Sequence, residues 1–121
     1  MTPDPISILQ TASLAEAAKI LDTRKISGLP VVDPSGCVVG VLSQTDLVRT
    51  RANSHLSAIW QGLPVGQIMT KPALTIAARA SLDEAARLME EHRVHRLVVC
   101  DEAATPIGII STSDLVRSWL R

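Results

Sequence analysis

The sequence of 121 residues contains no Phe and no Tyr, and its only aromatic residues are two Trp. The interior must therefore be aliphatic, and a bound base would lie between aliphatic side chains rather than stack on a ring. Proteins that bind single-stranded nucleic acid usually present aromatic side chains to the bases. The scarcity of rings argues against that class.

An excess of charge of one sign is also lacking, since 12 Lys and Arg balance 12 Asp and Glu. No general positive field is available for a phosphate backbone, and only local clusters remain. No apolar run approaches the length of a membrane span, and the N-terminus lacks the basic-then-apolar pattern of a signal peptide. The composition predicts a soluble, cytoplasmic protein. In such a compartment Cys37 and Cys100, which form no CxxC pair, are expected to be two buried free thiols rather than a disulfide.

Motifs of catalysis are absent: the sequence has no Gly-rich phosphate loop, no GxSxG elbow and no recognisable nucleophile with its base. We therefore expect no enzymatic activity and no resident cofactor. A metal-responsive module is the weakest reading, because His92 and His95 would need Cys100 and further ligands to complete a shell.

The chain is a duplication. Aligned with itself at an offset of 68 residues, it repeats about 18 of its first 49 residues identically and without a gap. The tetrapeptide Asp-Leu-Val-Arg, for example, stands at 46–49 and again at 114–117. Such self-similarity indicates two copies of one supersecondary unit. We call residues 1–52 the first copy, 53–66 the linker and 67–121 the second copy.

Each copy opens with the same two patterns. A short alternating segment, with Ile6 and Ile8 or Leu74 and Ile76, precedes a Ser-x-x-Glu capping box that starts a helix. The boxes are Ser13 with Glu16 and Ser81 with Glu84. The predicted core face of the helix has apolar residues at helical spacing: Leu14, Ala17, Ala18 and Leu21, and in the second copy Leu82, Ala85, Ala86 and Met89.

Each copy closes with a predicted hairpin and a second helix. The β-branched runs 29–32 and 38–42 flank a turn, as do 97–100 and 107–110. The second helices begin near Ser43 and Ser111. The sequence thus predicts an α+β fold of strand, helix, hairpin and helix, made twice. Since neither copy has enough helix to cover its sheet, the two should pack face to face as a pseudo-twofold pair.

The linker is expected to hold a short helix over His55–Gln61, ended by Gly62 and Pro64. Residues 65–68 then lead into Met69. The first copy begins at Met1 without such a lead-in, so either the lead-in was lost or the module was cut from a longer chain.

Several runs resemble the CBS domain, the module named after cystathionine beta-synthase. They are Ile68–Pro72, Val94–Val99 and Gly108–Leu115 in the second copy, and Ser27–Asp33 and Gly40–Asp46 in the first. The resemblance covers nearly the whole chain and occurs twice. It implies a pair of CBS domains, a ligand cleft between the copies, an adenosine-containing ligand and association into homodimers.

The resemblance implies that the Asp of a Gly-h-h-Ser/Thr-x-x-Asp motif (h, hydrophobic) binds ribose hydroxyls. Asp46 and Asp114 hold that place, with Ser43 and Ser111 beside them. A carboxylate can accept two hydrogen bonds from a vicinal diol. The same Ser-x-x-Asp pattern is an ordinary helix cap, and the two roles are compatible.

Phosphate contacts are implied for His95 and Arg96, and we add the hydroxyls of Thr45 and Ser113. Alternatively, the basic cluster of His92, Arg93, His95 and Arg96 is a solvated helix end favoured by the helix dipole.

The first copy has Ser27 and Gly28 where the second has His95 and Arg96. We therefore expect two unequal sites, the better one at Asp114.

The base is expected to contact short segments and aliphatic side chains of both copies. These residues, each explained equally well as part of the core, are Thr70, Lys71, Pro72, Leu74, Val94 and Ile109, with Thr2, Ile6, Ile26 and Val41.

The favoured function is a regulatory module that senses an adenosine ligand such as AMP, ADP or ATP. The alternative is a dimerisation platform without a ligand. Neither a membrane nor a nucleic acid is an expected partner.

Overall fold

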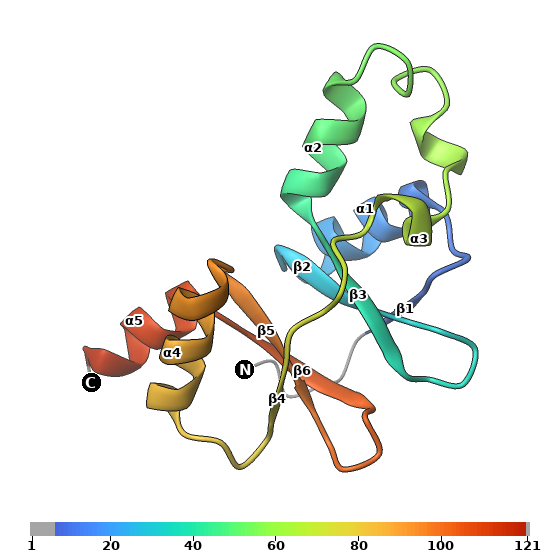
Figure 1. Cartoon of the computed structure of the whole chain (residues 1–121). Helices are drawn as coiled ribbons and strands as arrows, with labels where there is room; N and C mark the ends of the chain where they lie inside the picture. The colour runs from blue at the N-terminus through green and yellow to red at the C-terminus, as the bar shows by residue number, and fades with distance from the viewer. Residues whose placement is uncertain (1–6, 121) are drawn as a thin grey trace.

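The computed structural model describes residues 7–120, which form two three-stranded sheets, one in each copy (Figure 1). The first copy consists of β1 (Ile8–Leu9), α1 (Leu14–Arg24), β2 (Gly28–Val32), β3 (Val38–Ser43) and α2 (Gln44–Ala52). The second copy consists of β4 (Thr75–Ala77), α4 (Leu82–His92), β5 (Arg96–Cys100), β6 (Pro106–Ser111) and α5 (Thr112–Trp119). The predicted α+β succession, made twice, is confirmed.

Both sheets have the same topology. The middle strand pairs in parallel with the first strand and antiparallel with the third. Val31 lies opposite Ile8 and Gly40, and the equivalent Val99 lies opposite Ile76 and Gly108. Each hairpin also carries an irregularity at the equivalent place, next to Val31 or Val99. Equal register in both copies is what a duplication without gaps requires.

An Asp closes each hairpin turn. The Asp33 carboxylate accepts hydrogen bonds from the Ser35 hydroxyl at 2.6 Å and the Cys37 backbone N–H at 3.0 Å. These bonds, that from Ser35 above all, lower the pKa of Asp33. Asp101 accepts equivalent backbone bonds, so both turns use an Asx motif.

The first helices begin at Ser13 and Ser81, as predicted. Each Ser hydroxyl accepts from the backbone N–H three residues on, at 3.1 Å in both copies. The predicted capping boxes are only half formed, however, because within residues 7–120 the Glu16 and Glu84 carboxylates do not return the bond. The serine half already satisfies one free donor of the first turn.

The two cores differ in size. In the first copy the fully buried side chains include Leu14, Leu29 and Leu42, and this core extends to Val65 of the linker. The buried core of the second copy is smaller and consists of Ala85, Met89, Leu97 and Leu115.

Leu82 does not take the core position that its sequence predicts. Its side chain is 42% exposed, whereas its counterpart Leu14 is 0% exposed. The difference arises because Leu63 and Val65 cover the start of α1 and no segment within residues 7–120 covers the start of α4 in the same way.

The predicted helix over His55–Gln61 is wrong. This region forms turns, followed by the 3-10 helix η1 (Trp60–Gly62) and the one-turn helix α3 (Val65–Ile68). The Asn53 side chain accepts from the N–H groups of His55 and Leu56, at 2.8 and 3.2 Å, and so fixes a tight turn.

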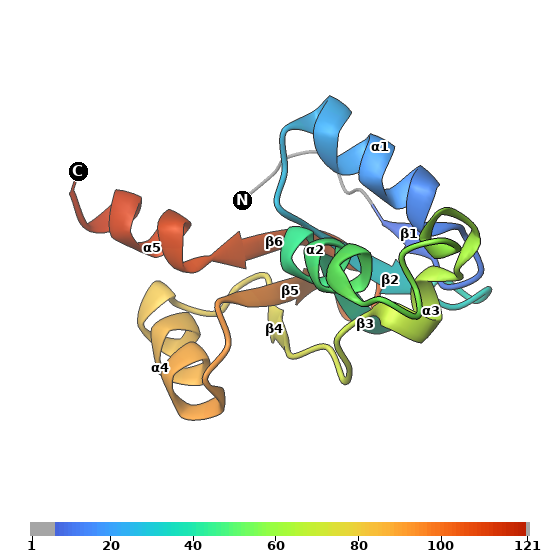
Figure 2. The same cartoon turned by 90° about the horizontal axis from the view of Figure 1, so that it is seen from above.

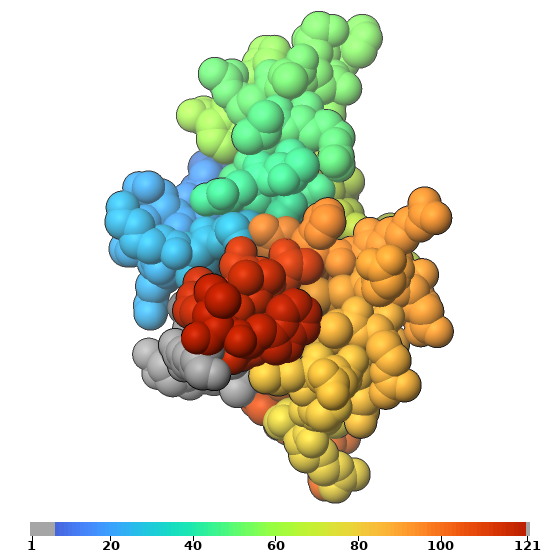
Figure 3. Space-filling model, turned by 90° about the vertical axis from the view of Figure 1, so that its left-hand side faces the viewer, coloured from blue at the N-terminus to red at the C-terminus, as the bar shows by residue number. Residues whose placement is uncertain are grey.

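The copies meet through their sheets. β2 of the first copy contacts β6 of the second, and Figure 2 shows the two sheets side by side between helices of both copies. The space-filling view in Figure 3 shows α5, in red, near the centre of the picture, with green and blue atoms above it and to its left and yellow and orange atoms on the right.

Both cysteines are free thiols, and Cys100 is buried as predicted, whereas Cys37 is only partly buried. Burial raises the pKa of the Cys100 thiol, and the neighbouring Asp101 adds to the rise.

Among the helices of residues 7–120, none is both long enough and apolar enough to cross a bilayer.

The equivalent residues Leu29 and Leu97, both 0% exposed, allow the two cores to be compared. We expect Leu29→Ala and Leu97→Ala each to lower the free energy of unfolding by about 2–5 kcal/mol. The loss of free energy should be smaller for Leu97→Ala, because the smaller core of the second copy, which lies beside an open hollow, can relax more easily around the cavity that the substitution leaves. Urea denaturation measures both values. Val48→Ala, at a side chain 68% exposed, is the control and should change stability by less than about 0.5 kcal/mol. Equal costs for the two leucines would contradict the difference between the cores.

Candidate functional site

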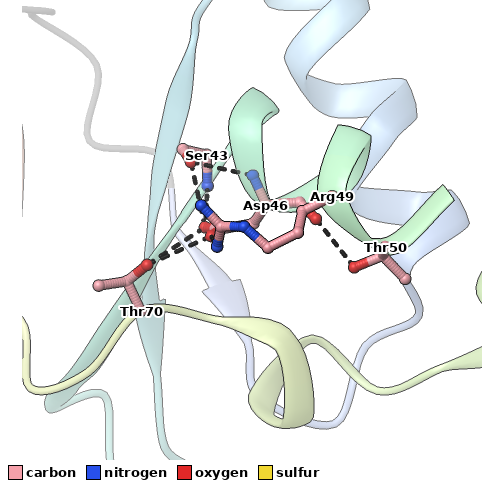
Figure 4. Close-up of polar contacts among 5 residues, drawn as sticks. All are labelled: Ser43, Asp46, Arg49, Thr50 and Thr70. Atoms are coloured by element: carbon pink, nitrogen blue, oxygen red, sulfur yellow. Dashed lines mark hydrogen bonds and ion pairs between the residues drawn. The ribbon is translucent and has the colours of Figure 1, made fainter. Parts of the chain in front are cut away.

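Asp46 is the centre of a polar cluster at the junction of β3 and α2 (Figure 4). Its Oδ2 accepts from the backbone N–H of Ser43 at 2.9 Å and from the Ser43 hydroxyl at 3.1 Å. The Ser43 hydroxyl in turn accepts from the Asp46 N–H at 3.3 Å. This is a complete capping box, and it fixes the carboxylate at the first turn of the helix.

The other oxygen of Asp46 faces the second copy. Oδ1 accepts from the Thr70 hydroxyl at 3.3 Å and pairs with the Arg49 guanidinium at 3.4 Å. These contacts are longer than the 2.9 Å bond to Oδ2. The Asp46 side chain is 3% exposed, so its charge is stabilised by hydrogen bonds rather than by water.

Thr70 is held in place by the main chain. Val41 and Thr70 exchange two backbone hydrogen bonds, of 2.9 and 3.0 Å. The neighbouring Gly40 makes this approach possible, because a Cβ there would lie 2.9 Å from the Thr70 carbonyl oxygen and 2.6 Å from the Met69 sulfur. The segment that opens the second copy is thus fixed on the sheet of the first.

Asp114 forms the equivalent cluster at the junction of β6 and α5. It has the same capping box with Ser111 and an ion pair of 3.2 Å with Arg117. Its side chain is 25% exposed, so it is more accessible than Asp46. Thr2, the counterpart of Thr70, lies outside the described residues.

Each Asp borders a hollow between the two copies. The Asp46 hollow has a volume of about 340 Å³ and the Asp114 hollow about 290 Å³. Both are near the lower end of the range of small-molecule sites, which starts at about 300 Å³.

The hollows are crossed: each joins the Asp of one copy to the segment before the middle strand of the other. The Asp46 hollow is lined by Val41, Ser43, Thr45, Asp46 and Arg49 of the first copy and Thr70, Pro72, Ala73, Leu74, Arg93, Val94, His95 and Arg96 of the second. The Asp114 hollow is lined by Lys25, Ile26, Ser27, Gly28 and Pro30 of the first copy and Arg96, Gly108, Ile109, Ser111, Ser113, Asp114 and Arg117 of the second.

The structure therefore brings together most of the predicted site residues, in two sets. Of the base-contact residues, Thr70, Pro72, Leu74, Val94 and Val41 lie at Asp46, whereas Ile26 and Ile109 lie at Asp114. Lys71 is exposed and lines neither hollow. Thr2 and Ile6 lie outside the described residues.

The position of His95 differs from our prediction. We expected the better site at Asp114 because His95 and Arg96 belong to the second copy, but His95 lines the Asp46 hollow, and its counterpart Ser27 lines the Asp114 hollow. The cause is the crossed packing, which pairs each Asp with the other copy's segment.

Arg96 lines both hollows. Its Nη2 donates to the Ser27 hydroxyl at 2.9 Å, and its buried Nε has no hydrogen-bond partner within residues 7–120. The side chain lies directly over Gly28, where a Cβ would be 3.0 Å from Nε. One guanidinium thus stands between the two hollows.

Sequence reasoning missed the two arginines that pair with the aspartates. Arg49 and Arg117 stand three residues after Asp46 and Asp114, and both line the hollows. This spacing on one helix face was the available signal. Both guanidinium groups are mostly exposed, so each pair contributes little to stability and is free to rearrange.

No group of three or more His, Cys, Asp and Glu side chains able to hold a metal ion occurs within residues 7–120. Cys100 ends β5, and His95 precedes its first residue, so the strand separates them.

Comparisons with known proteins agree with this geometry. The family model of the CBS domain matches residues 1–53 and 65–121. Inosine-5′-monophosphate dehydrogenase of Helicobacter pylori is 39% identical over 115 residues, which are 94% of this chain and 22% of that protein. The chain thus spans less than a quarter of the length of this relative.

Two similar solved structures contain adenosine compounds. CBSX2 of Arabidopsis thaliana, solved in complex with AMP, is 33% identical with a TM-score of 0.77, covering 95% of this chain and 87% of that one. A CBS domain pair in complex with 5′-methylthioadenosine and S-adenosyl-L-methionine is 27% identical with a TM-score of 0.85, covering 98% and 90%.

The burial of Asp46 predicts that it matters more for stability than Asp114. Asp46→Ala removes a cap and leaves Thr70 and Ser43 without their buried acceptor, so it should lower the free energy of unfolding by about 2–3 kcal/mol. Asp114→Ala should cost about 1 kcal/mol. Chemical denaturation measures both, with the exposed neighbour Thr45→Ala as control. A larger loss for Asp114→Ala would show that burial of the cluster is not what stabilises it.

Proposed function

Because the chain belongs to the CBS domain family, we propose that it is a regulatory module that binds an adenosine-containing ligand between its two copies and catalyses no reaction itself. The observation that carries this proposal is the composition of the hollows. Each combines a carboxylate, cationic side chains and aliphatic walls, which suit the ribose, the phosphate and the base of a nucleotide.

The two carboxylate oxygens of Asp46 have different roles in this proposal. Oδ2 keeps its short bond to the Ser43 N–H and continues to cap the helix. Oδ1 exchanges its longer contacts with Thr70 and Arg49 for a ribose hydroxyl. Capping and ribose binding, the two interpretations of the Ser-x-x-Asp pattern, therefore coexist in one side chain.

The base would lie between aliphatic side chains, because neither hollow is lined by an aromatic residue. Val41, Leu74 and Val94 offer this surface in the Asp46 hollow. The compounds bound by the two similar structures share the adenosine group and differ in the 5′ substituent, which supports recognition of adenosine as the common element.

We further propose that the hollows are unequal and that the Asp46 hollow is the better site for a phosphate. Arg93, His95 and Arg96 line it, and none of them forms an ion pair within residues 7–120. Charged hydrogen bonds from such groups to phosphate oxygens are among the strong ones. In the Asp114 hollow the cationic residues are Lys25, Arg96 and Arg117, and Ser27 stands in the place of His95, so this hollow lacks the imidazole.

Regulation requires that the ligand bind two arrangements of the copies with different affinity. The crossed hollows suit this requirement, since a ligand in either one contacts both copies. The chain spans only part of its curated relative, and we propose that a fused or separate partner receives the change.

A second candidate function is a homodimerisation platform. Val48 of α2 and its counterpart Val116 of α5 are 68% and 52% exposed, and Trp119 and Leu120 are 59% and 82% exposed. Apolar side chains in such positions favour association. Light scattering over a range of protein concentrations tests it, and a monomer at all concentrations would contradict it.

Calorimetric titration with AMP, ADP, ATP, NAD and S-adenosylmethionine tests ligand binding, and thermal shift provides an independent reading. At least one compound should bind and raise the melting temperature. If none binds or stabilises the protein, the ligand-sensing function is wrong and the platform remains.

The equivalent residues His95 and Ser27 give a matched test of the phosphate site. His95→Ala should weaken AMP binding about tenfold or more, since a hydrogen bond to a charged group is lost. It should leave adenosine binding nearly unchanged. Ser27→Ala should weaken AMP binding much less. Titrations of both variants with AMP and adenosine measure this, and equal losses of AMP affinity would contradict unequal hollows.

A further inference from the structure

Arg96 is the one residue, among residues 7–120, that lines both the Asp46 hollow and the Asp114 hollow. The carboxylate, its capping serine and the arginine paired with it are each present twice, once in each hollow. We infer that Arg96 couples the two hollows, so that a phosphate-bearing ligand in one weakens the binding of a second phosphate-bearing ligand in the other. This inference rests on the proposed function, because it concerns ligands of the same two hollows.

The packing of Arg96 explains why it serves both hollows. Arg96 is the counterpart of Gly28 in the repeat, and its side chain lies over that glycine. A Cβ on Gly28 would be 3.0 Å from the Arg96 Nε and 3.1 Å from its Cδ. The stem of the arginine is therefore packed on the backbone of β2, at the place where the two copies meet.

The guanidinium group of Arg96 is held by a single weak partner. Its Nη2 donates to the Ser27 hydroxyl at 2.9 Å, and Ser27 lines the Asp114 hollow. The residue before it, His95, lines the Asp46 hollow. A hydrogen bond to a charged phosphate oxygen is stronger than one to a neutral hydroxyl. A phosphate in either hollow therefore competes successfully with Ser27 for this group.

The Nε of Arg96 provides a further donor. It is buried and has no hydrogen-bond partner within residues 7–120. A buried donor without an acceptor is unfavourable, and an anion that accepts from it removes this penalty. The N–H groups of a guanidinium lie in one rigid plane, so two of them can bind one phosphate together. Arg96 is thus a strong ligand for the first phosphate that arrives.

The sign of the coupling follows from charge. The first phosphate-bearing ligand meets the full positive charge of Arg96, whichever hollow it enters. The second meets a guanidinium that the first phosphate has already neutralised, and the two phosphates also repel each other. Both effects weaken the second binding step, and they do so even when the guanidinium bridges the two phosphates.

The other cationic residues set the order of binding. Arg93 and His95 line the Asp46 hollow, so the first phosphate enters there and takes Arg96 with it. An uncharged adenosine ligand does not need Arg96, and its affinity for the Asp114 hollow stays the same. The fully occupied module therefore favours one phosphate-bearing ligand and one uncharged adenosine ligand.

The equivalent residues Val41 and Ile109 allow each hollow to be titrated alone. Both are partly buried, and each lines one hollow only. Val41→Trp fills the Asp46 hollow and leaves the Asp114 hollow open, and Ile109→Trp does the reverse. The backbone NMR signals of Thr45 and Ser113, exposed counterparts that line the Asp46 and Asp114 hollows respectively, report which hollow is filled.

The dissociation constant of AMP at the Ser113 signal should be at least about fivefold larger in the unmodified chain than in Val41→Trp. For adenosine the two values should agree within about twofold, because no coupling acts on an uncharged ligand. Arg96→Ala should lower the AMP ratio to about twofold or less at about 0.15 M salt, where direct repulsion between phosphates is screened. The control Arg93→Gln removes a cation that lines only the Asp46 hollow, and it should weaken the first binding step without changing the ratio.

The Nε–H signal of Arg96 gives a reading that needs no tryptophan variant, since burial of Nε slows the exchange of its proton with water. After AMP has saturated the Thr45 signal, filling the second hollow with more AMP should shift the Arg96 signal again. Filling it with adenosine should leave the Arg96 signal in place.

The coupling is overturned if AMP has the same affinity for the Asp114 hollow in the unmodified chain and in Val41→Trp. It is also overturned if the ratio survives Arg96→Ala, or if the second AMP leaves the Arg96 signal unchanged. In all three cases the adenosine site itself stands. If neither AMP nor adenosine shifts the Thr45 and Ser113 signals, the proposed function fails, and the coupling fails with it.

Discussion

The two backbone hydrogen bonds between Val41 and Thr70 tie the start of the second copy to the sheet of the first. They are antiparallel sheet bonds of 2.9 and 3.0 Å, made across the boundary between the copies, and they require the absence of a side chain at Gly40. From this tie follow the contact of the Thr70 hydroxyl with Asp46, the burial of that carboxylate and the crossing of the hollows. Contact between β2 and β6 also joins the copies, and the bonds between Val41 and Thr70 add a hydroxyl of the second copy to the Asp46 carboxylate.

Local patterns in the sequence were sufficient to predict the elements of the fold. The strands, the two helices of each copy and their serine caps all depend on residues within a few positions of one another, and they lie where periodicity placed them. The failures are of another kind. His95 faces Asp46 rather than Asp114, and Leu82 is exposed although its pattern equals that of Leu14. Both depend on contacts between distant segments, and a repeat looks the same whether its copies pack in a crossed or an uncrossed way.

The inequality of the copies has a steric origin. Gly28 and Arg96 are equivalent in the repeat and face each other in space, with Arg96 Nε 3.0 Å from the place of a Gly28 Cβ. A position that meets its own counterpart across a pseudo-twofold axis has room for one long side chain, not two. One copy therefore carries the guanidinium and the other a glycine, and the single Arg96 borders both hollows. Two long side chains are excluded at this point by volume, whereas one arginine opposite a glycine fits.

Asp114 and Arg117, which form an ion pair, line the Asp114 hollow and also a second hollow of about 310 Å³ between α4 and α5. The ion pair is therefore part of the lining of both hollows. A compound that binds Arg117 in one hollow changes the lining of the other hollow. The coupling free energy between the two bound compounds is the same in either direction. A compound bound in one of these hollows would therefore change the affinity of the other hollow, and the effect would be equal in the reverse direction.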